Sequence, residues 1–313
     1  MISFLKLIRL PNLILIAALQ YFIRQFLLFP MLASYGLLST LTNNQFYFLM
    51  LATTLIAAAG YIINDYFDLR IDYLNKPEKV IIGRSIKRRV AMALHVVFSL
   101  IGLVIFTYLA LHLKVAVLAI IPALVVGLLW FYSTDYKRQL LVGNFVAGIL
   151  AVFPILFVVL FETSIFKAYY SLDQQMIALL IFKVLGYFSF VVFLMALLIS
   201  IIKDYNEVQG DAAINCKTMP IVFGLKVTKV VVVILVLAIC YVLCYIQNLQ
   251  YANHAYVPLM FILLGIQVPL LTAMFALLFS NETYAGIWSH RLAMFAMVVG
   301  VFAIPVLNFF PGN

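Results

Sequence analysis

Charged residues are the scarcest class in this sequence. Asp, Glu, Lys and Arg together make up only 10% of the 313 residues, whereas 66% are hydrophobic. Soluble domains are about one quarter charged, and disordered chains combine high charge with low hydrophobicity, so both classes are excluded. A hydrocarbon core about 30 Å thick needs roughly 20 apolar residues per spanning helix. The composition therefore predicts a membrane protein with many spans.

Cysteine and histidine are also rare, with three and four residues. Cys216, Cys240 and Cys244 form no Cys-x-x-Cys pair and have no histidine at ligand spacing, which argues against a disulfide framework and a Cys/His metal site. The chain also lacks a Gly/Ser-rich or low-complexity linker, so we expect a single domain over residues 1–313.

Nine apolar runs are long enough to cross a bilayer, and runs of this length form helices there. We expect them at residues 11–29, 45–61, 90–111, 115–132, 141–161, 176–202, 230–246, 257–279 and 292–310. The first run follows basic residues as a signal peptide would. It is long and carries Arg24 near its end, so we interpret it as an uncleaved span. The expected fold is an all-α integral membrane protein.

The basic residues between these runs are concentrated on one side. That side receives 16 of the 20 Lys and Arg residues, including seven between Arg70 and Arg89. The positive-inside rule makes it cytoplasmic, with the N-terminus inside and the C-terminus outside. We therefore expect a multi-pass protein of the inner (plasma) membrane. Arg88 and Arg89 are best explained as topology anchors or contacts to lipid headgroups.

The acidic residues gather at two places on the same side. Six of the 11 form two triplets with the same i, i+3, i+7 spacing: Asp65, Asp68 and Asp72 after the second run, and Asp204, Glu207 and Asp211 after the sixth. On a continuing helix this spacing places three carboxylates on one face, where they repel each other unless a cation is bound. Carboxylates near membrane depth are costly and usually functional.

Oxygen ligands without Cys or His favour a hard cation such as Mg²⁺, which commonly completes its coordination with phosphate oxygens. Two acidic helix ends facing a cavity would hold two Mg²⁺ and a diphosphate, with all six acids as candidate ligands. The candidate diphosphate-binding residues are Arg84, Lys137, Lys203 and Lys217, each of which is otherwise a topology anchor. An isoprenoid tail suits a lipid-embedded cavity. The rings of Tyr61 and Tyr132 are candidates to stabilise an allylic carbocation, although in so aromatic a chain packing or an interface belt is the more common role of any single ring.

At these residues the chain resembles the UbiA-type intramembrane prenyltransferases. Asn64-Asp65-x-x-Asp68-x-x-x-Asp72 is similar to the first signature of that family, and Glu207 with Asp211 to the second. Tyr132-Ser133 with Lys137-Arg138, and Lys217-Thr218-Met219-Pro220, resemble two further segments. The resemblance implies nine helices around a central cavity and metal ligands at Asn64, Asp68, Asp72, Glu207 and Asp211, with Asp204 one turn earlier. It implies catalytic roles for Asp68, Asp72, Asp211 and Lys137.

The resemblance also implies a Mg²⁺-dependent transfer of a prenyl group from a prenyl diphosphate to an acceptor in the membrane. The loops at residues 75–84 and 210–220 look most like those of bacterial members grouped with geranylgeranylglycerol-phosphate geranylgeranyltransferases, so the expected acceptor is such a lipid. An aromatic acceptor of the hydroxybenzoate or dihydroxynaphthoate type is the alternative. We expect a metal-site carboxylate or the departing diphosphate to remove the acceptor proton. No nucleic acid and no obligate protein partner are expected.

Two hypotheses other than a prenyl-transfer activity remain open. A cation-coupled transporter would also carry intramembrane carboxylates, although it predicts acids near the bilayer midplane. An inactive member of the same fold is the other, because Glu207 stands where the family usually has Asp and Lys79-Val80 where it often has Arg-Pro.

Overall fold

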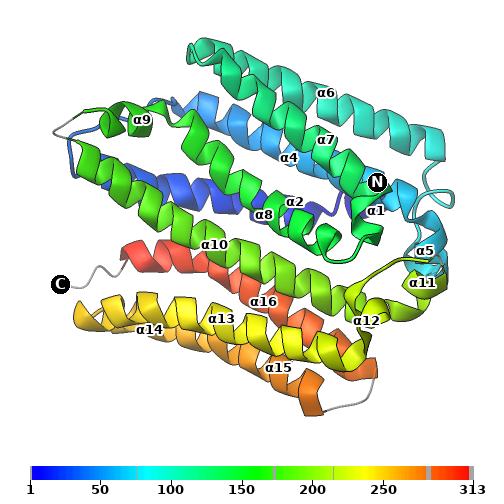
Figure 1. Ribbon diagram of the computed structural model, residues 1–313. Coiled ribbons are helices and arrows are strands. Elements are labelled where there is room, and N and C mark those ends of the chain that lie inside the picture. The colour runs from blue at the N-terminus through cyan, green and yellow to red at the C-terminus, as the bar shows by residue number, and fades with distance from the viewer. Residues whose placement is uncertain (1, 76, 172–173, 214, 280–282, 310–313) are drawn as a thin grey trace. The chain divides into compact units, whose positions relative to one another are not determined.

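The computed structural model describes residues 2–75, 77–171, 174–213, 215–279 and 283–309 (Figure 1). Lys76, in one of the resembling loops, and Phe310, the expected end of the last run, lie outside these ranges, as does the side chain of Lys79. Within them the chain forms helices joined by short turns and no named strand.

Nine helical segments within the described residues are long and apolar enough to span a membrane, in agreement with the sequence. Three of them combine more than one helical type: α2 (Leu10–Phe22) with η1 (Ile23–Leu28) and α3 (Phe29–Ala33); η3 (Ala116–Ala119) with α7 (Ile120–Thr134); and α14 (Tyr256–Ile262) with η5 (Leu263–Gln267) and α15 (Val268–Phe279). The other six are α4 (Asn43–Phe67), α6 (Arg88–His112), α8 (Val142–Phe161), α10 (Gln175–Asn206), α13 (Gly224–Ala252) and α16 (Thr283–Phe309).

Short helices occupy the connections. They are α1 (Ile2–Leu7), α5 (Leu69–Asn75), η2 (Pro77–Lys79), η4 (Tyr136–Arg138), α9 (Thr163–Tyr169), α11 (Val208–Ala213) and α12 (Met219–Val222).

Several spanning helices extend further than the apolar runs. Helix α4 continues six residues past Tyr61, α10 four residues past Ile202, and α16 begins at Thr283 instead of Leu292. Apolar runs stop at the first charged residues, whereas backbone hydrogen bonding continues and long charged side chains reach toward the headgroups. In α16, for example, Arg291 lies over the ring of Trp288 at 5.3 Å.

The chain divides into two compact units. The first contains residues 1–137 and 152–186, and the second contains residues 138–151 and 187–313. Helices α8 and α10 contribute residues to both. The expectation of a single domain over residues 1–313 concerns how these units assemble, and it stays a prediction.

In the first unit, α4 packs along α6 and α7. The approach of α4 to α6 is so close at Gly102 that an added Cβ would lie 2.7 Å from Cγ1 of Ile56. Nδ1 of the buried His95 lies 3.0 Å from the carbonyl oxygen of Ala59, which agrees with a packing role for this histidine. The turn from α6 to η3 is tight because Lys114 adopts the left-handed conformation at φ 58°.

A polar cluster is buried in the first unit near the start of α4. The carboxylate of Glu162 accepts hydrogen bonds from the backbone N–H of Thr40 and the hydroxyl of Ser39. The guanidinium of Arg24 donates to the carbonyl oxygen of Leu41 at 2.6 Å. Both charged groups are buried and both have hydrogen-bond partners, as a membrane interior requires.

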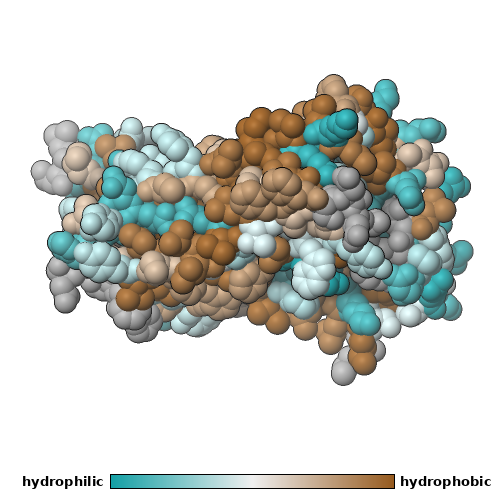
Figure 2. Space-filling model, turned by 90° about the horizontal axis from the view of Figure 1, so that it is seen from below, coloured by the Kyte–Doolittle hydropathy of each residue, from teal (hydrophilic) through white to brown (hydrophobic). Residues whose placement is uncertain are grey.

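In the second unit, α15 and α16 pack together and α13 contacts both α14 and α15. These helices share a core with α10. It consists of buried aliphatic residues, among them Leu198, Ile202, Val232, Ile239, Leu270 and Ala296. Large hydrophobic side chains also lie on the outside of both units, for example Val104, Leu124 and Ile234. On the face drawn in Figure 2, hydrophobic side chains cover a broad area, which is the surface that a multi-pass membrane protein presents to lipid tails.

Two of the helical glycines of the first unit, Gly102 and Gly127, predict opposite effects of alanine. At Gly102 the new methyl group would also lie 3.2 Å from the carbonyl oxygen of Ala52, whereas at Gly127 nothing lies within 4 Å. We expect Gly102→Ala to lower the free energy of unfolding by about 1–3 kcal/mol. Gly127→Ala should leave it unchanged or raise it by up to about 1 kcal/mol through helix propensity. Thermal unfolding in detergent measures both, and equal effects would contradict the close α4–α6 packing.

Candidate active site

The first acidic triplet lies where α4 passes into α5. The helix does not continue through it as the spacing predicts, because it is interrupted at Asp68, which has φ −85° and ψ 0°. The register is nevertheless kept. The N–H of Asp68 donates to the carbonyl of Asn64 at 3.0 Å, and the N–H of Asp72 donates to the carbonyl of Asp68 at 2.8 Å. The three acids therefore stay one turn apart on a helix with a joint at its middle acid.

The second triplet has the same construction. Helix α10 ends at Asn206 and α11 begins at Val208, so this helix is also interrupted at its middle acid, Glu207. The N–H of Glu207 donates to the carbonyl of Lys203 at 3.1 Å, and the N–H of Asp211 donates to the carbonyl of Glu207 at 3.0 Å. In both triplets the third acid lies on a short helix of its own, α5 or α11.

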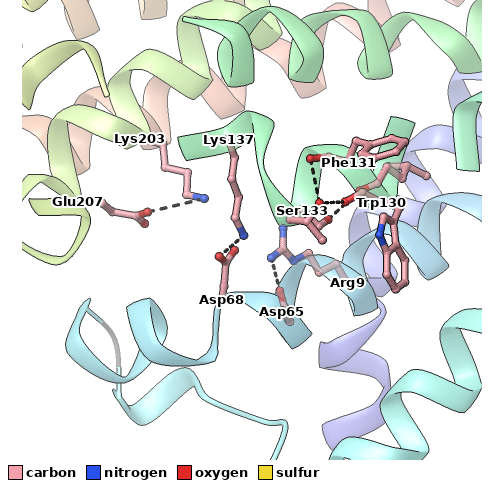
Figure 3. A network of polar contacts seen from close by, with 11 residues as sticks. Arg9, Asp65, Asp68, Trp130, Phe131, Ser133, Lys137, Lys203 and Glu207 are labelled. Atoms are coloured by element: carbon pink, nitrogen blue, oxygen red, sulfur yellow. Dashed lines mark hydrogen bonds and ion pairs between the residues drawn. The ribbon is translucent and has the colours of Figure 1, made fainter. Parts of the chain in front are cut away.

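Lys137 and Asp68 form an ion pair in the first unit. Lys137 comes from η4, directly after α7, and Figure 3 shows its ammonium pointing at the carboxylate of Asp68. The two side chains are only 12% and 10% exposed. The structure thus brings together a residue predicted to bind diphosphate and one predicted to bind metal. A buried carboxylate of this kind needs a cation, and Lys137 supplies it.

Arg9 holds the first acid of the same triplet. Its Nη2 donates to Oδ1 of Asp65 at 2.7 Å (Figure 3), and its guanidinium lies 4.9 Å from the ring centroid of Tyr61. Burial lowers the pKa of Arg9, but the charge and hydrogen bond of Asp65, together with the charges of Tyr61 and Asp72, outweigh burial, so the pKa is raised above its usual value. Arg9 itself adopts the left-handed conformation, with φ 51° and ψ 53°, just before α2.

The second unit holds a corresponding pair and a tethered acid. Nζ of Lys203 lies 3.7 Å from a carboxylate oxygen of Glu207, one turn away on the same helix. Asn144, buried near the start of α8, donates to Oδ2 of Asp204 at 2.7 Å and to the hydroxyl of Ser200 at 2.9 Å. The third acid, Asp211, is buried.

The remaining candidates lie as follows. Arg84 is exposed and stacks over Tyr73 at 5.4 Å, on a loop that turns at Gly83 with φ 87°. Lys217 is exposed, and its backbone N–H donates to the carbonyl of Arg138 at 2.9 Å. Tyr132, Asn64 and Asp72 are half-buried.

Sequence reasoning missed two residues. Arg9 was counted only among the cytoplasmic basic residues, and Asn144 was not considered. Their partners lie 56 and 60 residues away in the chain, so no local spacing pattern connects them. The one available signal was a polar residue near the end of an apolar run: Arg9 just before the first run and Asn144 near the start of the fifth.

The donor set suits Mg²⁺ by its chemistry, since it consists of carboxylate oxygens and one amide oxygen. Among the described residues, no three His, Cys, Asp or Glu side chains converge closely enough to hold a metal ion on their own. Mg²⁺ at phosphate sites commonly takes only one or two protein carboxylates and completes its coordination with waters and substrate phosphates. The residues present therefore fit Mg²⁺ that is bound together with a phosphate-bearing substrate.

Comparison with known proteins agrees with this chemistry. The family model described as the UbiA prenyltransferase family matches residues 27–285. Among curated proteins, a digeranylgeranylglyceryl phosphate synthase of Sulfurisphaera tokodaii is 30% identical over 195 residues, which are 60% of this chain and 62% of that protein. The chain thus matches about three fifths of the length of this relative.

Solved structures with the same fold include two archaeal UbiA homologues. The one from Aeropyrum pernix has a TM-score of 0.63 at 15% identity, covering 92% of this chain and 96% of its own. The one from Archaeoglobus fulgidus, bound to DMAPP and Mg²⁺, has a TM-score of 0.56 at 13% identity, covering 97% and 99%. Because this family model matches well over half of the chain, the chain belongs to the UbiA prenyltransferase family.

Proposed function

We propose that this protein transfers a prenyl group from a prenyl diphosphate to the hydroxyl of a glycerol-phosphate lipid, with two Mg²⁺ ions. The observation that carries the proposal is the buried pair of Lys137 and Asp68 beside the first signature. A carboxylate and a lysine held together in this way supply one group for a divalent cation and one for the phosphate that the cation binds. A solvated acidic helix end would need no such pairing.

Each unit contributes one lysine paired with the middle acid of its triplet: Lys137 with Asp68, and Lys203 with Glu207. Bound Mg²⁺ neutralises a diphosphate and makes it a better leaving group. The residues that would hold metal are Asn64, Asp68 and Asp72 in the first unit, and Glu207 and Asp211 in the second. With metal bound there, Lys137 and Lys203 would be able to turn to phosphate oxygens, and the exposed Arg84 and Lys217 would be further contacts.

The reaction breaks the bond between the allylic carbon and the diphosphate oxygen and forms one from that carbon to the acceptor oxygen. The hydroxyl proton leaves to a metal-site carboxylate or to the departing diphosphate. An aromatic face stabilises the positive carbon without attacking it. The candidates for this role are Tyr61, over which the guanidinium of Arg9 lies at 4.9 Å, and Tyr132.

The acceptor class is supported by sequence similarity at two levels, local and over most of the chain. The loops at residues 75–84 and 210–220 resemble those of lipid-acceptor members, and the Sulfurisphaera tokodaii relative is named a digeranylgeranylglyceryl phosphate synthase. We place the reaction at the cytoplasmic face of the plasma membrane, because the signature segments share the side that carries 16 of the 20 basic residues.

The lysine–aspartate pair predicts a large loss of activity on mutation. We expect Lys137→Ala to lower kcat/KM for the prenyl diphosphate by about 100-fold, because a buried charged interaction with the leaving group is worth roughly 2–4 kcal/mol. Lys137→Arg should retain more activity, and Lys87→Ala, an exposed cytoplasmic residue, should match the wild type. Steady-state kinetics in detergent or nanodiscs measures all three. Equal rates for Lys137→Ala and Lys87→Ala would contradict the assigned role.

The acceptor is tested directly with radiolabelled geranylgeranyl diphosphate. We expect product with geranylgeranylglyceryl phosphate, and none with hydroxybenzoate or dihydroxynaphthoate. EDTA should abolish turnover and Mg²⁺ should restore it, because the leaving group then has no counter-charge. If only an aromatic acceptor gives product, the proposed lipid acceptor is wrong and the activity is one of quinone biosynthesis. Turnover that is unaffected by EDTA would overturn the metal-dependent mechanism.

A further inference from the structure

The six acids of the two triplets fall into two classes by their partners. The middle acids, Asp68 and Glu207, contact flexible lysines. The first acids, Asp65 and Asp204, are held by Arg9 and Asn144, which come from other helical segments. We infer that Arg9 and Asn144 are positioning residues: they act through Asp65 and Asp204, which fix the two signature helices in place and do not bind metal. This inference rests on the proposed function for the identity of the metal and the diphosphate.

The geometry at Asp65 favours an anchor over a ligand. Its carboxylate already receives a charged hydrogen bond of 2.7 Å from Arg9. A guanidinium cannot lose its proton in a protein and repels a divalent cation on the same carboxylate. Lys137 differs, because an ammonium on a flexible stem can turn from a carboxylate to a phosphate. Arg9 is also stacked on Tyr61, whose hydroxyl lies 3.5 Å from Nδ2 of Asn12, so its head is held on two sides.

The backbone at Arg9 supports the same conclusion. A non-glycine residue in the left-handed region is uncommon and costs roughly 1 kcal/mol, and it persists where surrounding contacts determine it. Arg9 takes this conformation at the junction of α1 and α2. The chain thereby turns so that one arginine reaches the end of α4, which ties the start of the chain to the first signature.

Asp204 is fixed in a different way but to the same effect. Asn144 is 4% exposed, and the two N–H bonds of its amide reach Ser200 and Asp204. Asn144 lies on α8, whereas Ser200 and Asp204 lie on α10, about two turns and one turn before the interruption at Glu207. The hydrogen bonds therefore join α8 to the last turns of α10 within the second unit.

Metal binding separates an anchor from a ligand. We would titrate Mn²⁺, as a paramagnetic substitute for Mg²⁺, into purified protein with geranylgeranyl diphosphate and follow it by electron paramagnetic resonance. Asp68→Asn should weaken Mn²⁺ binding by more than about tenfold, as loss of a direct ligand does. Asp65→Asn and Asp204→Asn, which keep a hydrogen-bonding oxygen, should weaken it by less than about fivefold. If either weakens it as much as Asp68→Asn, that acid is a ligand and the inference is wrong for it.

A double-mutant cycle tests whether Arg9 acts through Asp65. Arg9→Met leaves a bare carboxylate close to the first signature, so KM for the prenyl diphosphate should rise about tenfold or more. Adding Asp65→Asn removes that carboxylate, and KM should return toward the wild-type value. Arg9→Lys keeps the positive charge but not the planar guanidinium over Tyr61, so its KM should lie between those of the wild type and Arg9→Met. A pair that serves stability alone would lower the unfolding temperature in both single variants without this reversal of KM, and that result would overturn the positioning role.

A second substitution tests Asn144 by charge. Asn144→Asp places a second carboxylate beside Asp204, so it should lower the unfolding temperature and raise KM, whereas Asn144→Asp combined with Asp204→Asn should restore both. The failure of this inference differs from the failure of the proposed function. A wild-type protein that binds Mn²⁺ with the diphosphate but forms no product would overturn only the function. One that binds no Mn²⁺ would overturn both.

Discussion

The structure depends on one constraint, which is that a bilayer offers no solvation to charge. Every charged group placed at depth must therefore be given a partner by the protein. Glu162 takes its hydrogen bonds from Thr40 and Ser39, Arg24 donates to Leu41, and Asp204 is held by Asn144. The middle acids of the two triplets, Asp68 and Glu207, meet the same demand with lysine partners.

The two signature segments answer this constraint with the same backbone solution. Both helices keep their hydrogen-bonded register across the middle acid and yet are interrupted there, at Asp68 and at Glu207. Acids before the interruption belong to a spanning helix, and acids after it belong to a short helix. Each eight-residue segment thus divides its acids between two helices, and this happens twice in the chain.

Most of the architecture could be predicted from the sequence because the bilayer imposes it: an apolar run of sufficient length must be a helix. The nine spans and the fold class are confirmed in the part of the chain that the structure describes. The interruptions at Asp68 and Glu207 could not be predicted, since the spacing of three acids is the same on a straight helix. Nor could the partners of Asp65 and Asp204, which arise from packing between helices. Which acids bind metal stays a prediction.

The length of α4 fixes the depth at which the chemistry takes place. Its 25 residues rise about 37 Å at 1.5 Å per residue, more than the roughly 30 Å of hydrocarbon. If the helix enters the bilayer near Asn43, then Tyr61 lies close to the opposite edge of the hydrocarbon, and Asp65 and Asp68 lie among the headgroups. A prenyl diphosphate rests at that same depth by its own amphipathic character. It can therefore reach the acids by diffusing sideways within one leaflet, with its tail never exposed to water.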